Sequence, residues 1–353
     1  MPIDNLVLVL DAGASHDLGC DNKPLPLMQD WNIVLRRALD ERDARLSGLV
    51  GIHEGDDGPT FEKALGDFLK WQGIFELAAR FEPFGLDDPI NYDMRPWRDQ
   101  AEARAKMVVE TLNRTLYEQF GSSRASDIAA AKAYGALLEA MDMNAGAMVT
   151  VATTNYDPAA ELAFAELGRR PEIGDVAGPR SARLLDPEGL IGKCKEGRGT
   201  AVLHLHGKVG LYTQADGSVR VEPDSDPFNE SAGTPTVVLP DPEKDPMLQS
   251  AIRALWTEFD NALGQATHVL VLGHSLHDRV LVEHICVQAG RARKAITVLP
   301  EADEDELARV GGLIPASTVI SGRFGPHLQA PSEPLPFLGN LASWSGDARG
   351  VRP

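Results

Sequence analysis

Cysteine is scarce in this chain, and the three that occur, Cys20, Cys194 and Cys286, lie far apart in the sequence. No Cys-x-x-Cys pair is present, which excludes a zinc ribbon and disfavours a disulfide framework. Long apolar runs are also missing: runs such as Leu6–Leu10 span about five residues, whereas a membrane-spanning helix needs roughly 20. The first five residues lack the basic and apolar segments of a signal peptide, so we expect a cytoplasmic protein that does not bind membranes.

Excess positive charge is absent as well. The 353 residues contain 34 Lys and Arg against 52 Asp and Glu, which gives a formal net charge of −18. A surface that coats nucleic acid must neutralise phosphates, so we expect no direct nucleic-acid binding. With 43% hydrophobic and 24% charged residues, the composition is that of a globular protein and not of a disordered chain.

Five short apolar runs predict strands that are buried on both faces, as in parallel sheets. They are Leu6–Leu10, Met148–Ala152, Val202–Leu205, Val269–Leu272 and Ala295–Leu299. Apolar residues at helical spacing, around Trp31 and from Ile252 to Leu263, predict helices between them. Alternating strands and helices form right-handed crossovers, so the predicted fold is α/β, with a doubly wound, parallel, Rossmann-like sheet.

The alternation is interrupted in several places. Residues 40–142 contain helical patterns and no convincing strand, which predicts an inserted helical subdomain within a Rossmann-like domain made of residues 1–39 and 143–325. Residues 171–200 and 212–246 are rich in Gly, Pro and Asp and are predicted to be long surface loops. Residues 326–353 are expected to form a loosely docked C-terminal tail.

Polar residues follow four of the predicted strands, at the sheet edge where open α/β folds bind ligands. These groups are Asp11–Ser15, Thr153–Pro158, His204–Lys208 and Gly273–Asp278.

The first two groups suit a nucleotide. The small residues Gly13, Ala14 and Ser15 would let backbone N–H groups approach a pyrophosphate, although such a sequence also forms turns without a ligand. Asp157 is placed to cap a helix from Pro158 to Leu167, a role that does not account for Asn155.

The other two groups suggest a base and a further contact. Strand alternation puts His204 and His206 on one side, and no third ligand stands at metal-binding spacing, so no metal is expected. His206 is the candidate general base, and His204 is equally consistent with a buried structural role. The small residues from Gly273 suit a ribose or phosphate, and the Gly-x-Ser-x-Gly motif of serine hydrolases is absent.

Taken in order, the four groups resemble the sirtuin-like NAD-cleaving superfamily, and more closely its bacterial branch without zinc. Sirtuins have a Gly-Ala-Gly-x-Ser turn, a Thr-Gln-Asn-x-Asp motif, a His-Gly motif and a Gly-x-Ser strand end. The counterparts here are Asp11–Ser15, Thr153–Asp157, His206-Gly207 and Gly273–Ser275. The resemblance spans roughly residues 5 to 300.

Three departures from the sirtuin pattern bear on function. Asp11 replaces the first glycine of the turn, where a carboxylate would repel a phosphate unless it is capped or faces a ribose hydroxyl. Thr154 replaces the usual glutamine. The two zinc-binding Cys-x-x-Cys pairs of protein-deacylating sirtuins are missing, which argues against an acyl-lysine peptide cleft.

The resemblance implies an NAD glycohydrolase, with NAD as substrate, that releases nicotinamide and ADP-ribose. It implies Asn155 and His206 as catalytic residues, and it places the NAD contacts at Asp11, Gly13, Ala14, Ser15, Thr154, Asp157, Gly273, Ser275 and Asp278. Two alternatives remain open: a sensor that binds NAD or ADP-ribose without cleaving it, and an NAD-dependent protein deacylase.

Bacterial relatives often act in antiviral defence by depleting NAD, and such an enzyme must be kept silent until it is needed. By this analogy we expect a homo-oligomer, or a partner such as a hexameric translocase-type ATPase or an Argonaute-like protein.

Overall fold

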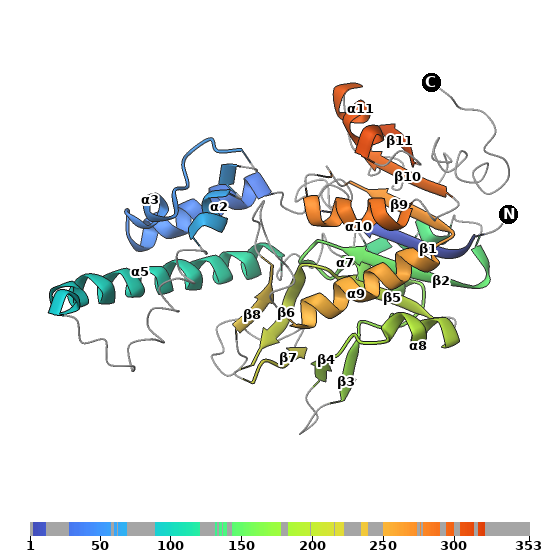
Figure 1. The fold of residues 1–353 in the computed structure, drawn as a ribbon, viewed down its shortest axis with the longest axis horizontal. Helices are drawn as coiled ribbons and strands as arrows, with labels where there is room; N and C mark the ends of the chain where they lie inside the picture. Colours follow the sequence, from blue (N-terminus) through green and yellow to red (C-terminus); the bar gives the residue numbers. More distant parts are fainter. Residues whose placement is uncertain are drawn as a thin grey trace. The chain divides into compact units, whose positions relative to one another are not determined.

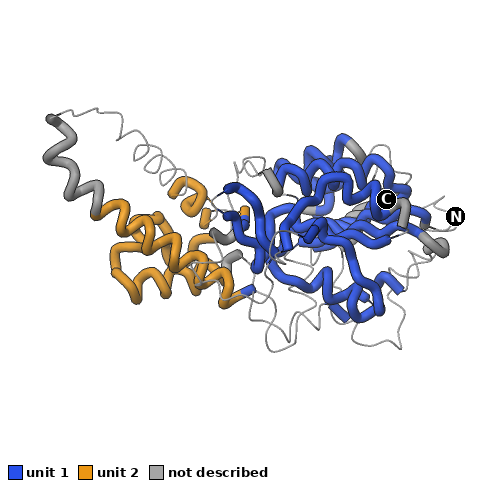
Figure 2. Tube along the Cα trace, turned by 90° about the horizontal axis from the view of Figure 1, so that it is seen from below, with its two compact units in different colours: residues 1–25, 120–237, 245–353 blue, residues 26–119, 238–244 orange. Residues whose placement is uncertain are grey.

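The computed structural model describes residues 3–11, 28–57, 60–61, 63–68, 89–120, 131–132, 134–135, 137–139, 143–177, 183–197, 199–214, 216–221, 234–238, 250–273, 276, 278–289, 294–299, 304–313 and 317–321. Contacts divide the chain into two compact units, coloured separately in Figure 2. Unit 1 comprises residues 1–25, 120–237 and 245–353, and unit 2 comprises residues 26–119 and 238–244.

Unit 1 is built on a six-stranded sheet in which every neighbouring pair is parallel (Figure 1). In spatial order the strands are β11 (Ser317–Ser321), β10 (Lys294–Leu299), β9 (His268–Leu272), β1 (Ile3–Leu10), β2 (Met143–Thr153) and β5 (Thr200–His204). Numbered by their order along the chain, they run 6-5-4-1-2-3, the order of a doubly wound dinucleotide-binding sheet. The strand order reverses between β1 and β9, so the switch point lies between these two strands.

The predicted α/β class and parallel sheet are confirmed, and all five apolar runs contribute to sheet strands. The strands alternate with α7 (Ala159–Glu166), α8 (Leu190–Gly197), α9 (Ser250–Gln265), α10 (Arg279–Ala289) and α11 (Glu304–Leu313). Helix α7 begins one residue later and ends one residue earlier than predicted.

The core of unit 1 follows from the alternation of side chains along β1. Leu6, Leu8 and Leu10 are almost fully buried and pack in one cluster with Phe164 of α7. Val7 and Val9 are equally buried and point to the opposite face, where α9 contacts β1 and β5. Burial on both faces explains why this strand reads as a continuous apolar run.

The prediction of loops over residues 171–200 and 212–246 is wrong, because these segments contribute to a second sheet of five strands. Its order is β3 (Asp175–Ala177), β4 (Arg183–Leu185), β7 (Val219–Val221), β6 (Gly207–Thr213) and β8 (Thr234–Val237). All of its pairings are antiparallel. Leu211, Val219 and Val221 form its small core, and Leu185 packs against them.

Unit 2 contains the helices α2 (Met28–Arg42) and α3 (Leu46–Val50) and nearly all of α5 (Pro89–Phe120). Trp31 is fully buried here, its indole N–H donates to Thr115 Oγ1 at 3.1 Å, and its ring meets Phe61 edge to face. Among the described residues between 40 and 142, helices occur and strands do not. The predicted domain boundaries at 39/40 and 142/143 remain a prediction, and the predicted tail, 326–353, lies outside the described residues.

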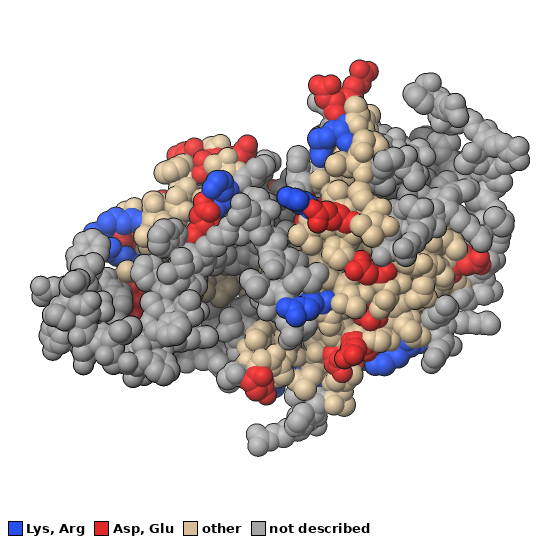
Figure 3. Space-filling model, in the orientation of Figure 1, with Lys and Arg blue, Asp and Glu red and all other residues tan. Residues whose placement is uncertain are grey.

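Two features are missing from the described residues. No helix among them is long and apolar enough to cross a membrane. Within the same residues, no group of three or more His, Cys, Asp or Glu could hold a metal ion. On the face drawn in Figure 3, described Asp and Glu side chains occur at several separate places and do not form one patch.

Candidate functional site

The carboxyl ends of four parallel strands meet at one edge of the sheet. Backbone hydrogen bonds continue past the strands: Asp11 N–H donates to Leu272 O at 3.3 Å, and Thr154 N–H donates to Leu10 O at 3.1 Å. Leu205 N–H donates to Thr153 O at 2.9 Å. The residues that directly follow β9, β1, β2 and β5 therefore stand side by side in that order, which brings together the described members of the predicted polar groups.

Asp11 and Thr154 contact each other at the ends of β1 and β2. The Thr154 hydroxyl donates to Asp11 Oδ1 at 2.5 Å, and Thr154 is buried while Asp11 is half-buried. The carboxylate is thus capped locally by a hydroxyl, which is one of the two conditions under which it is compatible with a nearby anion. Thr154 supplies that cap.

Asn155 and Asp157 are both buried directly after β2. Asn155 N–H donates to Thr153 Oγ1 at 3.0 Å, which bends the chain away from the strand direction. Asp157 Oδ1 accepts the N–H of Ala159, the first residue of α7, at 2.9 Å, so its capping role is present. Burial raises the pKa of Asp157, and the Ala159 N–H and the charge of His204 oppose that rise without cancelling it.

His204, at the end of β5, belongs to a buried charged cluster with Glu161 and Lys208. Its Nδ1 donates to the backbone oxygen of Asn155 at 3.3 Å, and its Nε2 lies 3.0 Å from Glu161 Oε2. Lys208 Nζ donates to Glu161 Oε1. Burial alone would raise the pKa of Glu161, but the charges and hydrogen bonds of His204 and Lys208 outweigh it and hold that pKa well below its usual range.

His206 has a different set of partners. Its Nε2 lies 3.1 Å from Asp278 Oδ2, and the two side chains are only 6% and 9% exposed. Its ring centroid is 6.2 Å from that of Trp256 in α9, whose indole N–H donates to Leu205 O at 2.9 Å. His206 follows β5 and Asp278 follows β9, so this ion pair joins residues whose strands have β1 and β2 between them in the sheet.

The expectation that His204 and His206 share one side is wrong, because the strand ends between them. Residues 205 and 206 form a turn, and Gly207 begins β6 with a φ of +73°, in the left-handed region. A Cβ on Gly207 would stand 2.0 Å from the backbone oxygen of Thr236 in β8. The turn therefore requires glycine, and it directs the two rings to different helices.

The segment after β9 also turns through left-handed conformations. Gly273 has a φ of +64°, and Leu276 has a φ of +53°, which is unusual for a residue with a side chain. Asp278 then caps α10 by accepting the N–H of Leu281 on Oδ1 at 3.1 Å. The remaining predicted contacts of this edge, Gly13, Ala14, Ser15 and Ser275, lie outside the described residues.

Three residues of this edge carry interactions that the sequence did not indicate: Glu161, Lys208 and Trp256. Lys208 directly follows the His-Gly pair and Glu161 stands one helical turn after Asp157, but neither spacing predicts that they pair across α7 and β6. Trp256 reads as an ordinary core position of a helix. No sequence signal shows that its indole reaches a strand-end carbonyl.

Neither described cysteine is set up as a nucleophile. Burial, together with the nearby carboxylates of Glu172 and Glu258, raises the pKa of the Cys194 thiol to about 11. Burial also raises the pKa of Cys286, whose thiol donates to Leu313 O at 2.8 Å. Both thiols are thus held in the unreactive protonated form.

Comparison with protein families gives one match: residues 149–310 match the model of a SIR2-like domain. Three of the four motifs, those that begin at Thr153, His206 and Gly273, lie within the matched residues, and Asp11–Ser15 lies outside. This segment is therefore similar to a sirtuin-like domain. No curated protein sequence matches the chain.

Solved structures of Sir2 proteins resemble the chain at low identity. One, described as a basis for the mechanism and regulation of Sir2 enzymes, is 15% identical, with 97% of this chain and 94% of that chain covered and a TM-score of 0.41. A complex of a Sir2 homologue with NAD is 14% identical, with 97% and 91% covered and a TM-score of 0.43. A triple mutant of a Sir2 homologue with 2′-O-acetyl ADP ribose is 14% identical, with 98% and 95% covered and a TM-score of 0.40.

Proposed function

We propose that this chain is an NAD glycohydrolase, which cleaves the bond between nicotinamide and ribose to give nicotinamide and ADP-ribose. One observation carries the proposal: the residues that follow β9, β1, β2 and β5 share the carboxyl edge of a 6-5-4-1-2-3 sheet, which includes its switch point, and they include a buried His206–Asp278 pair. Ligands of open α/β sheets bind at this place. The SIR2-like match over residues 149–310 supports NAD as the substrate.

The reaction requires orientation more than strong acid catalysis. The C1′–N bond breaks through an oxocarbenium-like state, nicotinamide leaves with the bonding electrons, and the oxygen of water adds to C1′ as the water loses a proton. By the sirtuin resemblance, Asn155 positions the water or the ribose hydroxyls, and His206 takes up a proton through those hydroxyls. Asp157 contacts the nicotinamide amide.

The rest of NAD is assigned to the same edge of the sheet. In this proposal Gly13, Ala14 and Ser15 hold the pyrophosphate, and Gly273 and Ser275 contact the adenosine half. Asp11 and Thr154 act as a pair at the ribose, since the Thr154 hydroxyl already neutralises part of the carboxylate's acceptor capacity. This pairing supports a role for Asp11 at the ribose, where its charge does not repel a phosphate.

The biological setting is proposed by analogy with bacterial relatives. The enzyme would act in the cytoplasm as an effector of antiphage defence that depletes NAD. A homo-oligomer, or a translocase-type ATPase or Argonaute-like partner, would hold it silent until infection.

The test is nicotinamide release from NAD, followed by chromatography at several protein concentrations, for the wild type, Asn155→Ala and His206→Ala. Loss of a general base costs about 10²- to 10⁴-fold in rate, so His206→Ala should be nearly inactive while it remains folded. Full activity of that variant would overturn the assignment of His206.

The alternatives predict other outcomes of the same experiment. A sensor would leave NAD intact, although NAD would raise the unfolding temperature. A deacylase would release nicotinamide only with an acyl-lysine peptide present.

A further inference from the structure

We infer that Asp278 is a positioning residue for His206 and not a contact to NAD, an inference that rests on the proposed function. Sequence analysis placed Asp278 among the NAD contacts because of its position after β9. In the structure, its two carboxylate oxygens already have partners within the protein, one on α10 and one on the histidine.

The two carboxylate oxygens of Asp278 have different partners, and these partners fix the orientation of the side chain. Oδ1 accepts the N–H of Leu281 at 3.1 Å, and the backbone oxygen of Asp278 accepts the N–H of Val282 at 3.0 Å. The start of α10 thus sets the orientation of the side chain. Oδ2 is left directed at His206 Nε2, at 3.1 Å.

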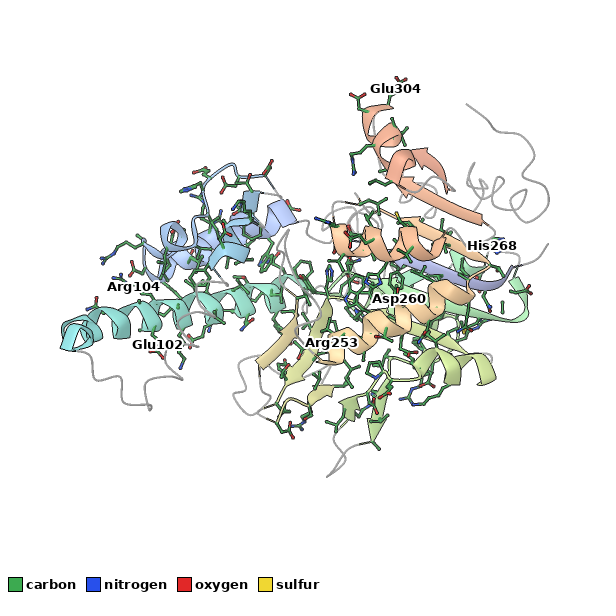
Figure 4. All side chains as sticks on the ribbon, viewed as in Figure 1. Glu102, Arg104, Arg253, Asp260, His268 and Glu304 are labelled. Carbon is green, nitrogen blue, oxygen red and sulfur yellow. The ribbon has the colours of Figure 1, made fainter. Side chains whose placement is uncertain are left out.

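The histidine ring is held on other sides as well. Trp256 packs against it at a centroid distance of 6.2 Å and is itself tied to Leu205 O. Trp256 in turn packs at 4.9 Å on His284 of α10, whose Nδ1 lies 2.6 Å from Oδ1 of Asp260, a residue labelled on α9 in Figure 4. The His206 ring therefore lies between Trp256 of α9 and Asp278, the residue before α10, and α10 also packs on Trp256 through His284.

This geometry determines which nitrogen of His206 does the chemistry. The Asp278 carboxylate oxygen lies 3.1 Å from Nε2, so its negative charge favours a proton on Nε2 and leaves Nδ1 as the nitrogen that accepts a proton. During cleavage a ribose hydroxyl passes its proton to Nδ1 and takes up the proton that the attacking water loses, and the imidazolium that forms is stabilised by the Asp278 carboxylate. Proton release to water then restores the neutral ring, and Asp278 is never protonated.

The attraction between His206 and Asp278 is strengthened because both side chains are almost entirely shielded from water. Charges interact more strongly in a low-dielectric interior than in water, and both side chains are below 10% exposed. His204, the other histidine of this segment, is different: its Nδ1 donates to Asn155 O and its Nε2 faces Glu161. Both nitrogens of His204 thus face acceptors within the protein, which assigns His204 a structural role.

The test uses Asp278→Asn and Asp278→Ser, because both substitutions keep an oxygen that caps α10, and neither keeps a carboxylate against His206. We expect kcat to fall about 10²- to 10⁴-fold, as when the carboxylate partner of a catalytic histidine is neutralised, with little change in the Kd of NAD. Asp57→Asn is the matched control, since Asp57 caps Thr60 at an exposed position and should leave kcat unchanged.

A second measurement reports the tautomer directly. In protein labelled with ¹⁵N-histidine, the His206 ring signals are identified by their loss in His206→Ala. We expect protonated Nε2 in the wild type and a change in the tautomer in Asp278→Asn. In the His206→Ala background, Asp278→Asn should cause no further loss of activity.

Two results would overturn the inference: a raised Kd for NAD with kcat preserved, which would make Asp278 a substrate contact, or an unchanged kcat and tautomer. If the wild type released no nicotinamide, the proposed function would fail. The ¹⁵N spectra would still decide whether Asp278 sets the state of His206.

Discussion

Asp157 and Glu161 are carboxylates one helical turn apart, and their surroundings shift their pKa values in opposite directions. Asp157 is buried and the Glu161 side chain is only 16% exposed, and burial disfavours the charged form of each. Glu161 has His204 and Lys208 against it, whereas the hydrogen bond that Asp157 accepts from Ala159 does not compensate for burial. Glu161 is thus stabilised as an anion, whereas keeping Asp157 ionised in the folded protein costs stability.

That cost gives a prediction for Asp157→Asn. The folded-state pKa of Asp157 is raised above its ordinary value of 3.8, so its contribution to stability is fully present below that value and is lost as the pH rises through the folded pKa. Asparagine keeps the acceptor for Ala159 N–H and cannot ionise. The variant should therefore unfold a few degrees higher than the wild type at pH 7, with the difference vanishing at low pH.

Thermal unfolding between pH 3 and pH 8 measures this effect. Glu166→Gln, at the exposed end of α7, is the control and should show no such pH-dependent gain. The same Asp157→Asn variant should cleave NAD more slowly, because residues kept at a cost in stability tend to serve function. A lower unfolding temperature at pH 7 would contradict the account of Asp157.

At the scale of elements, the sequence predicted five of the six strands of the parallel sheet, and it missed β11 and every strand of the antiparallel sheet. Val269–Leu272 is apolar throughout because both faces of the central sheet are covered. Such a run is not typical of loops, so the strand could be predicted. β3, β4 and β7 have three residues each, too few for any periodicity, and their pairing depends on partners up to about 40 residues away. Gly and Pro around them indicated loops, whereas Gly217, for example, lies in the short connection between β6 and β7.

The turn from β5 to β6 gives a prediction at this scale. Gly207→Ala would place a methyl group against the Thr236 carbonyl and hold a φ of +73°, so we expect a loss of about 2–4 kcal/mol in unfolding free energy. Gly217→Ala is the matched control: its φ is +83°, nothing lies within 4 Å, and it should cost about 1 kcal/mol. Denaturant unfolding compares them, and equal losses would show that the approach to β8 is not tight.

For the whole molecule, the strand order decides which predicted residues meet. The sequence indicated four polar strand ends but not their order, because apolar runs do not specify their neighbours. The order β9-β1-β2-β5 brings Asp11 to Thr154, and its turns bring His206 to Asp278, a pairing across 72 positions of sequence that no local pattern contains. The roles of Asn155 and His206 came from the sirtuin resemblance, and the partners that fix them came from the fold.

The measurement that tests the central claim most directly is the fate of NAD incubated with the purified wild-type chain and with His206→Ala, quantified by mass spectrometry. We predict that the wild type converts NAD to equal amounts of nicotinamide and ADP-ribose, and that His206→Ala binds NAD and leaves it intact. NAD that is neither consumed nor bound by the wild type would contradict the claim that this sheet edge is an NAD-cleaving site.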